Sequence, residues 1–380
     1  LVAAGGRVVA AEDGAAALAR ADLVYDGIVG IGGKGALRPR AAELVGAARG
    51  AVVAVDLPSG VDADTGEVAG DAVRADVTVT FGTYKPGLLV DPGAGRAGAL
   101  RLIDIGLDLG APELEALQHA DLAALLPRPT GESDKYRRGV VGIVAGSDRY
   151  PGAAVLAVSG ALRGGAGAVR YVGGGGPAVL ARHPETLVTT GSPHAAGRVQ
   201  AWVVGPGLGD DAGARAAVEE VLAADVPVLV DADGLRLMSR DAVRARTAPT
   251  LLTPHAGEAA ALLGRGREEV EAARLEAVRA LAAEFRATVL LKGSTTLVAS
   301  PAGAGPVRVN ATGSAWLATA GSGDVLSGLA GSLLAAGLSA LDAGSSAAYL
   351  HGLAARLARG PLTALDVAEA LPTAWRSTSP

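Results

Sequence analysis

Six short apolar runs that end in glycine, aspartate or serine constrain the fold of this 380-residue chain more than any other feature. They read AVVAVD (51–56), VTVTFG (77–82), VVGIVAGS (140–147), AWVVGPG (201–207), VPVLVDADG (226–234) and TVLLKGS (288–294). Fully apolar strands are typical of parallel sheets that are covered on both faces. Segments with helical spacing lie between them, at 212–223, 258–263 and 268–285. The alternation predicts layered α/β structure.

The length of the chain exceeds that of one ordinary domain. Strand signals lapse between Leu107 and Glu132, where prolines, polar residues and charges gather. We therefore expect two domains, at 1–120 and 121–380. Ligands of parallel sheets bind beyond the carboxyl ends of the strands, and here those ends carry the glycine-rich loops.

Composition excludes several classes of protein and site. The net charge is −5 and no basic block is present, which argues against nucleic-acid or anionic membrane partners. The absence of cysteine excludes disulfides and thiol chemistry, and the five histidines show no zinc-like spacing. No apolar stretch reaches the roughly 20 residues of a membrane span. We expect a cytoplasmic protein that acts on a small molecule.

One acid occupies an unusual position. Between Asn310 and Gly337 the sequence NATGSAWLATAGSGDVLSGLAGSLLAAG places Asp324 directly after Gly-Ser-Gly and before an apolar run with helical spacing. Helix N-termini expose unpaired N–H groups, and glycines let an anion approach that backbone closely. A carboxylate beside a bound anion is useful as a base, but Asp is also a favoured N-cap. From these residues alone both interpretations of Asp324 remain open.

Seven segments of the second region form an ordered set. They read KYRRGVVGIVAGS, YPGAAVLAVSGALRGGAGAV, VVGPGLG, VLVDADGL, LLTPHAGEAAALL, LLKGSTTLV and TAGSGDVLSGLAGSLLAAG. From about Asp121 onward the chain thus resembles the NAD(P)H-hydrate dehydratase domain of the ribokinase-like superfamily. The resemblance implies that Asp324 is the catalytic base, beside an anion hole formed by Gly321, Ser322 and Gly323.

The same resemblance assigns two sets of binding residues. Ala153, Gly207, His255 and Asp324 would bind the hydrated dinucleotide. Lys292, Gly293, Ser294, Thr295, Thr296 and Gly323 would bind an adenine nucleotide, with the Lys292 ammonium as a point charge for phosphate. The structural alternatives are an exposed lysine at the end of a strand and a histidine that merely pairs with a backbone carbonyl.

Three segments of the first region carry a second resemblance. YDGIVGIGGKGALR, VDLPSGVDADTG and VTVTFGTYKPGLLVDPG together resemble the Rossmann-like NAD(P)HX epimerase domain of bifunctional nicotinamide nucleotide repair enzymes. The implied cradle for the hydrate comprises Gly30, Ile31, Gly32, Gly33, Lys34, Gly35 and Ala36. Asp56 would contact the hydrate as the acid/base group, and Asp26 and Ser59 would hold K⁺, whose preference for hard oxygen ligands suits them. The alternative is that Asp56 merely opens a turn that Ser59 caps.

The family's Asn/Gly/Asp-rich loop has no counterpart in this chain, so we expect a partial, vestigial or truncated epimerase domain. The resulting prediction is dehydration of the S epimer of NADHX or NADPHX to NADH or NADPH, with ADP or ATP as donor, Mg²⁺ as cofactor and a homo-oligomer such as a tetramer as the assembly. The rival interpretations are a ribokinase-like kinase of a vitamin precursor or sugar, and a scaffold that binds nucleotides without turnover.

Overall fold

The computed structural model describes residues 2–301 and 305–378, and the chain divides into two compact units. The first unit ends at Ala111 and includes residues 271–276, and the second contains the remaining residues from Pro112 onward. The division therefore falls inside the segment Leu107 to Glu132, somewhat before residue 120.

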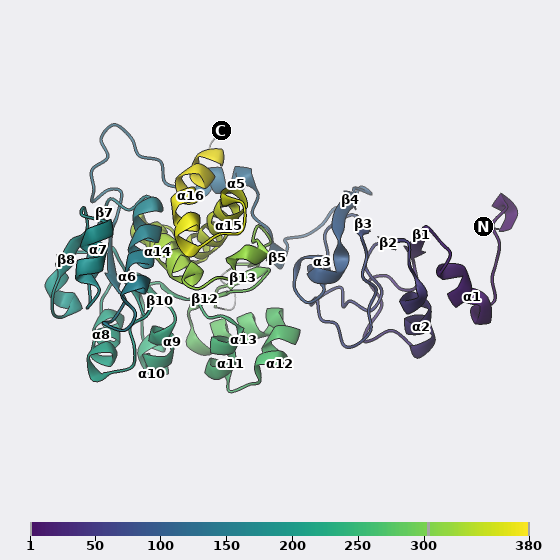
Figure 1. The fold of residues 1–380 in the computed structure, drawn as a ribbon, viewed down its shortest axis with the longest axis horizontal. Coiled ribbons are helices and arrows are strands. Elements are labelled where there is room, and N and C mark those ends of the chain that lie inside the picture. Colours follow the sequence, from purple (N-terminus) through teal and green to yellow (C-terminus); the bar gives the residue numbers. More distant parts are fainter. Residues whose placement is uncertain (1, 302–304, 379–380) are drawn as a thin grey trace. The chain divides into compact units, whose positions relative to one another are not determined.

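The first unit contains one parallel sheet (Figure 1). Its strands pair in the order β1 (Leu23–Asp26), β2 (Ala51–Val55), β3 (Val77–Phe81) and β4 (Ala99–Ile103). Its helices are η1 (Val2–Ala4), α1 (Ala11–Leu18), α2 (Pro39–Ala47), α3 (Pro86–Leu89) and α4 (Ala94–Ala97). A small buried cluster joins the segment that follows β2 to α3 and α4, and it comprises Leu57, Val61, Ala63, Leu88 and Ala97.

The second unit contains a ten-stranded sheet in the order β5-β14-β13-β12-β11-β10-β9-β6-β7-β8. The strands from β8 to β12 in this order are parallel, and β13 runs antiparallel to both of its neighbours. Their bounds are β5 (Leu114–Glu115), β6 (Val140–Val144), β7 (Ala168–Val172), β8 (Leu187–Thr189), β9 (Ala201–Val204), β10 (Val228–Val230), β11 (Thr250–Leu252), β12 (Thr288–Leu291), β13 (Thr296–Ala299) and β14 (Val307–Asn310).

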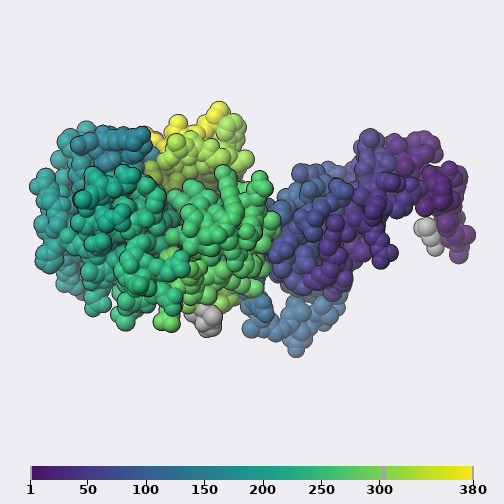
Figure 2. All heavy atoms as spheres, turned by 90° about the horizontal axis from the view of Figure 1, so that it is seen from below, coloured from purple at the N-terminus to yellow at the C-terminus, as the bar shows by residue number. Residues whose placement is uncertain are grey.

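Helices cover both faces of this sheet, with α14, α15 and α16 on one face and α8, α10, α11 and α13 on the other (Figure 1). In the space-filling view the yellow C-terminal helices lie against the teal and green parts of the same unit (Figure 2). The bounds are α5 (His119–Leu125), α6 (Pro151–Arg163), α7 (Gly176–Arg182), η2 (Pro193–Ala196), α8 (Ala212–Leu222), α9 (Asp233–Leu237), α10 (Arg240–Arg244), α11 (Ala256–Leu263), α12 (Arg267–Ala272), α13 (Arg274–Phe285), η3 (Ala315–Leu317), α14 (Ser322–Ala335), α15 (Ala340–Ala358) and α16 (Ala364–Ser377).

Glycines bring the backbones of α6 and α14 unusually close together. A Cβ atom at Gly160 would lie 2.1 Å from the carbonyl oxygen of Val325, and one at Gly328 would lie 1.9 Å from that of Ala157. Either clash would push the helices apart, because a protein interior of this density has no free space to absorb a methyl group. The first turn of α14 is therefore held in a fixed position over the sheet.

The six apolar runs all form strands, which confirms the α/β prediction. The prediction of a single helix at 268–285 is wrong in one respect, because the segment is divided at Ala273 into two helices, α12 and α13. Neither glycine nor proline marks that break in the sequence. Among the described residues, no helix combines the length and the apolar character that crossing a membrane would require.

Candidate active site

Asp324 lies inside the first turn of α14 rather than ahead of it. The N-cap is Gly321, which has a left-handed backbone with φ of 85°, and Asp324 is the third helical residue. The interpretation of Asp324 as an ordinary N-cap is therefore wrong. Gly321, Ser322 and Gly323, predicted as the anion hole, form the start of this helix, where backbone N–H groups and the helix dipole favour negative charge.

The pKa of the Asp324 carboxyl is raised to about 7. Burial is the main cause, and the negative charge of Asp231 adds to it. Lys292 acts in the opposite direction, and Asp233 makes a smaller upward contribution. A carboxyl group with a pKa near neutrality can both accept and release a proton at physiological pH, as a general base must.

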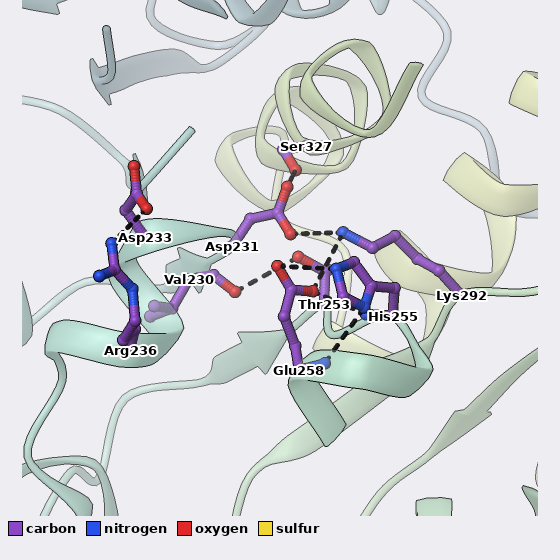
Figure 3. Close-up of polar contacts among 9 residues, drawn as sticks. All are labelled: Val230, Asp231, Asp233, Arg236, Thr253, His255, Glu258, Lys292 and Ser327. Atoms are coloured by element: carbon purple, nitrogen blue, oxygen red, sulfur yellow. Dashed lines mark hydrogen bonds and ion pairs between the residues drawn. The ribbon is translucent and has the colours of Figure 1, made fainter. Parts of the chain in front are cut away.

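A buried network of charges adjoins Asp324. Asp231 follows β10 and is 1% exposed, and its Oδ1 accepts a hydrogen bond of 2.6 Å from Lys292 Nζ. Its Oδ2 accepts one of 2.6 Å from Ser327 Oγ, one turn after Asp324 in α14 (Figure 3). Both carboxylate oxygens are thus satisfied, as a buried charge requires. A Cβ at Gly323 would lie 3.5 Å from Lys292 Nζ, so the ammonium lies next to the predicted anion hole.

Lys292 lies directly after β12, and its side chain is only 20% exposed. Burial lowers the pKa of its ammonium, but the surrounding carboxylates outweigh burial and raise the pKa above its ordinary value. These carboxylates belong to Asp231, Glu258 and Asp324. The alternative of an exposed lysine at a strand end is wrong. Of the other residues predicted to bind nucleotide, Gly293, Ser294 and Thr295 lie in the turn between β12 and β13, and Thr296 begins β13.

His255 is the N-cap of α11 and forms a capping box with Glu258. Its Nδ1 accepts a hydrogen bond of 3.1 Å from the backbone N–H of Glu258, whose Oε2 accepts one of 2.7 Å from the backbone N–H of His255. The partner of the ring is therefore a backbone N–H, not the carbonyl of the structural alternative. The ring is 59% exposed, and Glu258 Oε2 lies 3.8 Å from Lys292 Nζ, which places His255 beside the buried network (Figure 3).

Two further residues predicted to bind the hydrate come together. Ala153 lies in the first turn of α6, and a Cβ at Gly207, after β9, would lie 2.5 Å from the Cβ of Ala153. Gly207 has a φ of 60°, so a larger residue there would meet both backbone strain and a clash. Gly207 and Ala153 thus form a tight wall at the carboxyl ends of β6 and β9.

A buried histidine supports the first turn of α14 from the neighbouring helix. His351 in α15 is 6% exposed, and its Nε2 lies 3.0 Å from the carbonyl oxygen of Ser322. Burial lowers the pKa of His351 to about 4. The ring is therefore neutral at pH 7, and its Nε2–H donates to Ser322.

In the first unit, the predicted potassium ligands are in direct contact. Ser59 is completely buried, and its Oγ and backbone N–H donate hydrogen bonds of 2.7 Å to Asp26 Oδ1 and Oδ2. Ser59 Oγ also lies 3.4 Å from the carbonyl oxygen of Val29. Carboxylate, hydroxyl and carbonyl oxygens thus converge, a donor set whose chemistry fits a hard monovalent cation.

Asp56 faces the predicted cradle. A Cβ at Gly30 would lie 3.7 Å from Asp56 Oδ2, whereas Oδ1 accepts hydrogen bonds from Lys85 Nζ at 2.5 Å and Thr80 Oγ1 at 3.2 Å. Asp56 also has a φ of 72°, which is unfavourable for a residue with a Cβ and is found preferentially at functional sites. Asp56 does more than open a turn, and Ser59 pairs with Asp26 rather than acting as a simple cap.

The sequence analysis did not single out Asp231, Ser327, His351 or Lys85. The only sequence signal for Lys85 is the rarity of lysine, with four against 30 arginines. Asp231 lies in the quoted segment VLVDADGL, where an acid directly after a buried strand is a signal for the carboxyl edge of the sheet. Among the described residues, no group of three or more His, Asp or Glu side chains is arranged to hold a metal ion.

Comparisons with known proteins identify a family for each of the two parts of the chain. Residues 141–372 match the family model of NAD(P)H-hydrate dehydratase, and residues 1–87 match that of the YjeF-related protein N-terminus. A domain of the N-terminal family is thus present in this chain, and within it the Asp26–Ser59 and Asp56–Lys85 contacts are formed.

Three relatives illustrate the likeness. The chain is 52% identical over 346 residues to the bifunctional NAD(P)H-hydrate repair enzyme Nnr of Mycobacterium leprae, and the match covers 90% of this chain and 70% of that protein. The ADP/ATP-dependent NAD(P)H-hydrate dehydratase of Bacillus subtilis, co-crystallised with ATP/Mg²⁺, is 32% identical with a TM-score of 0.64, covering 69% of this chain and 98% of that structure.

A ribokinase-like superfamily protein of Enterococcus faecalis is 24% identical with a TM-score of 0.63, covering 72% of this chain and 99% of that structure, and supports the fold alone. The fold of the second unit is therefore ribokinase-like. On the two family models and the identity to the mycobacterial protein, the chain belongs to the family of bifunctional NAD(P)H-hydrate repair enzymes.

Proposed function

We propose that the second unit dehydrates NADHX and NADPHX to NADH and NADPH with a phosphoryl group from ADP or ATP. The observation that carries the proposal is Asp324, a carboxyl with a pKa of about 7 in the first turn of α14, adjoining the Lys292 ammonium. A base, an anion-binding helix start and a cation are the groups that phosphoryl transfer to a hydroxyl requires.

The proposed reaction begins when Asp324 accepts the proton of the hydroxyl on the hydrated nicotinamide ring. The hydroxyl oxygen bonds to the terminal phosphorus, and the bond from that phosphorus to the rest of the nucleotide breaks. The lone pair of the ring nitrogen then expels phosphate and leaves an iminium. The ring carbon next to the one that carried the phosphate loses a proton to water, which restores the ring double bond. The start of α14 and Lys292 stabilise the negative charge on the phosphoryl oxygens.

The phosphoryl donor and the metal ion are inferred from coordination chemistry and from the similarity to a solved dehydratase. The Bacillus subtilis relative is named as ADP/ATP-dependent and was crystallised with ATP/Mg²⁺. Mg²⁺ usually combines few protein carboxylates with phosphate oxygens and water. Because the part of the chain that the structure describes contains no cluster of three candidate ligands, we propose that Mg²⁺ arrives on the nucleotide and neutralises part of its charge. A homo-oligomer remains a prediction.

For the first unit we propose binding of the same hydrates and exchange between their R and S epimers. The supporting observation is that Asp56 directs Oδ2 toward the Gly30 loop while Lys85 holds Oδ1. Asp26 and Ser59 would hold K⁺ beneath that loop. Chiral chromatography of a pure R epimer, with and without K⁺, tests both parts of this proposal.

The central experiment incubates the protein with NADHX and either ADP or ATP and follows the return of the nicotinamide absorbance. We expect the signal with wild type and its loss with Asp324→Asn. A small-alcohol kinase of the same fold would leave a stable phosphate ester and restore no absorbance. Nucleotide consumption by wild type without any absorbance change would therefore refute dehydration in favour of that rival.

A further inference from the structure

A cavity of about 280 Å³ lies at the opposite edge of the second unit's sheet from Asp324. Its lining includes Arg138, shortly before β6, and Gly165, shortly before β7, so it lies at the amino ends of these parallel strands. Asp324 lies in the first turn of α14, whereas Ala336, which lines the cavity, directly follows the last residue of that helix. At 1.5 Å per residue these two positions are about 18 Å apart. The cavity is therefore separate from the candidate active site.

Positive charge gathers around this cavity. None of the lining residues that the structure describes is an acid, and four are arginines, namely Arg128, Arg137, Arg138 and Arg163. The chain as a whole has a net charge of −5, so this excess of positive charge is local. Among the described residues, only Arg137 of the four forms an ion pair, at 3.6 Å with the exposed Glu132. Guanidinium groups that converge on one cavity without paired acids favour an anionic ligand.

Two of the guanidinium groups are anchored to backbone carbonyls through a single nitrogen. Arg128 Nη2 donates to the carbonyl oxygen of Ala123 at 3.3 Å. Arg138 Nη2 donates to the carbonyl oxygen of Gly165 at 3.2 Å. Because a guanidinium carries five N–H donors, each anchored group retains donors for a ligand. The anchors also hold the charges in place before a ligand arrives, which reduces the entropy lost on binding.

Arg163 has no such anchor. It is the last residue of α6 and is exposed. It makes no hydrogen bond or ion pair with any residue that the structure describes. A basic residue in the last turn suits the helix dipole, but the dipole alone does not satisfy its N–H donors. An anion in the cavity would accept hydrogen bonds from them.

The rest of the wall is apolar and stiff. Trp375 of α16 and the three prolines Pro127, Pro129 and Pro372 belong to the lining. A Cβ at Gly165 would lie 3.6 Å from the Trp375 ring, so glycine leaves this ring edge uncovered. Gly165 also has a φ of 90°, which favours glycine. An apolar wall beside the arginines strengthens their interaction with an anion, because it excludes water.

We propose that this cavity is a second anion site, which binds a compact phosphate-bearing molecule with its phosphate groups between the four arginines. Guanidinium forks match phosphate oxygens bidentately. The volume lies just below the roughly 300–1,000 Å³ of drug-sized sites, so a diphosphate fits better than a whole dinucleotide. Nucleic acid is a poor ligand, because the chain carries net negative charge outside the cavity. The phosphates can come from free pyrophosphate or from ADP, and the experiment distinguishes these sources.

Arg163→Gln provides the test, because it removes one charge at an exposed position without breaking a contact within the described part of the protein. The matched control is Arg244→Gln, which is also exposed, in the last turn of α10 and outside the cavity. Calorimetric titration at low ionic strength measures the binding of pyrophosphate, ADP and citrate to each protein. Phosphate that binds near Lys292 contributes equally to all three proteins, so only the differences between them report on the cavity.

We expect wild type and Arg244→Gln to bind pyrophosphate equally, and Arg163→Gln to bind it about tenfold more weakly, because one charge-assisted contact is worth about a factor of ten or more. Citrate spreads its carboxylates over a larger molecule, so Arg163→Gln should leave its binding unchanged. Equal factors of loss for pyrophosphate and ADP would identify the free anion as a sufficient ligand. A larger loss for ADP, together with tighter binding of ADP to wild type, would identify the nucleotide, with its base against Trp375.

Two results would overturn the inference. Equal affinities of wild type and Arg163→Gln for both pyrophosphate and ADP would leave the arginines as groups that only stabilise helix ends. An effect on citrate as large as that on pyrophosphate would show a general anionic attraction rather than a phosphate site. Dehydration of NADHX does not enter the measurement, so a failure of the proposed function would leave this test intact.

Discussion

Replacing Asp324 with asparagine should abolish dehydration and at the same time stabilise the protein above neutral pH. Asparagine preserves the size of the side chain but cannot accept the proton, so the rate should fall on the order of 100-fold or more. The carboxylate of the wild type must remain charged in a half-buried place beside Asp231, and the variant removes that cost.

The size of the stabilisation follows from the shift in the pKa of Asp324. A rise from an ordinary 3.8 to about 7 corresponds to an upper bound of about 4 kcal/mol, at about 1.36 kcal/mol for each tenfold change in proton affinity. Because solvent reaches the side chain, screening reduces this figure, and we expect about 2 kcal/mol. For a domain of this size that equals a rise in Tm of about 4 to 8 °C.

The raised pKa of Asp324 also determines how the stability difference between the variant and wild type changes with pH. Between pH 3.8 and about 7 the unfolded chain has already released the Asp324 proton while the folded protein retains it, so wild-type stability falls as pH rises through this window. The advantage of Asp324→Asn should therefore be full above pH 7 and vanish toward pH 4. Calorimetry from pH 4 to 8 measures it, with Asp211→Asn, an exposed N-cap where Asn serves equally well, as the control. A variant that is inactive but less stable than wild type at pH 8 would refute this account of the site.

Three further predictions concern the groups around the two sites. Lys292→Ala should weaken nucleotide binding more than hydrate binding and move the rise of activity with pH to higher values, since Lys292 lowers the pKa of Asp324; equal nucleotide affinity by calorimetry would contradict it. Wild type should lose stability as the pH falls from 6.5 toward 4, because the folded protein resists protonation of His351. His351→Gln should lack this part of the pH dependence, and thermal unfolding at pH 5 and 7.5 provides the comparison. Lys85→Met should impair epimer exchange while NADHX dehydration stays at the wild-type rate, and loss of both activities would show that the effect is not confined to the first unit.

Much of the fold could be predicted from the sequence because its strands are short, apolar and separated by helical spacing. The prediction failed where the local pattern carries no signal. The break at Ala273 between α12 and α13 lies in a continuous run of good helix formers. The antiparallel position of β13 depends on a turn at residues 292–295, which the sequence analysis interpreted as a binding segment alone.

The site could be predicted only in part. The roles of Asp324 and Lys292 were predicted because their segments resemble the dehydratase domain, whereas the place of Asp324 between glycines and an apolar helix left its interpretation as an N-cap open. Ser327 was not, because a serine in an apolar helix looks like a small packing residue until the fold brings Asp231, 96 positions earlier, against it. His351 was not predicted for the same reason, since its contact with Ser322 depends on the packing of α15 against α14.

The basicity of Asp324 thus depends on residues that only the tertiary structure brings together. β10, β11 and β12 run parallel, so the residues that follow them, Asp231, His255 and Lys292, emerge at one edge of the sheet. Helix α14 brings its N-terminus to that edge, where Gly323 lies beside Lys292, and it packs closely against α6 through Gly160 and Gly328. Its dipole and Lys292 favour the charged form of the carboxyl, whereas burial and Asp231 oppose it. Without the negative charge of Asp231, the pKa of the Asp324 carboxyl would be lower and the group would be a weaker base. By engaging Lys292 and Ser327, Asp231 leaves Asp324 able to accept a proton near neutral pH.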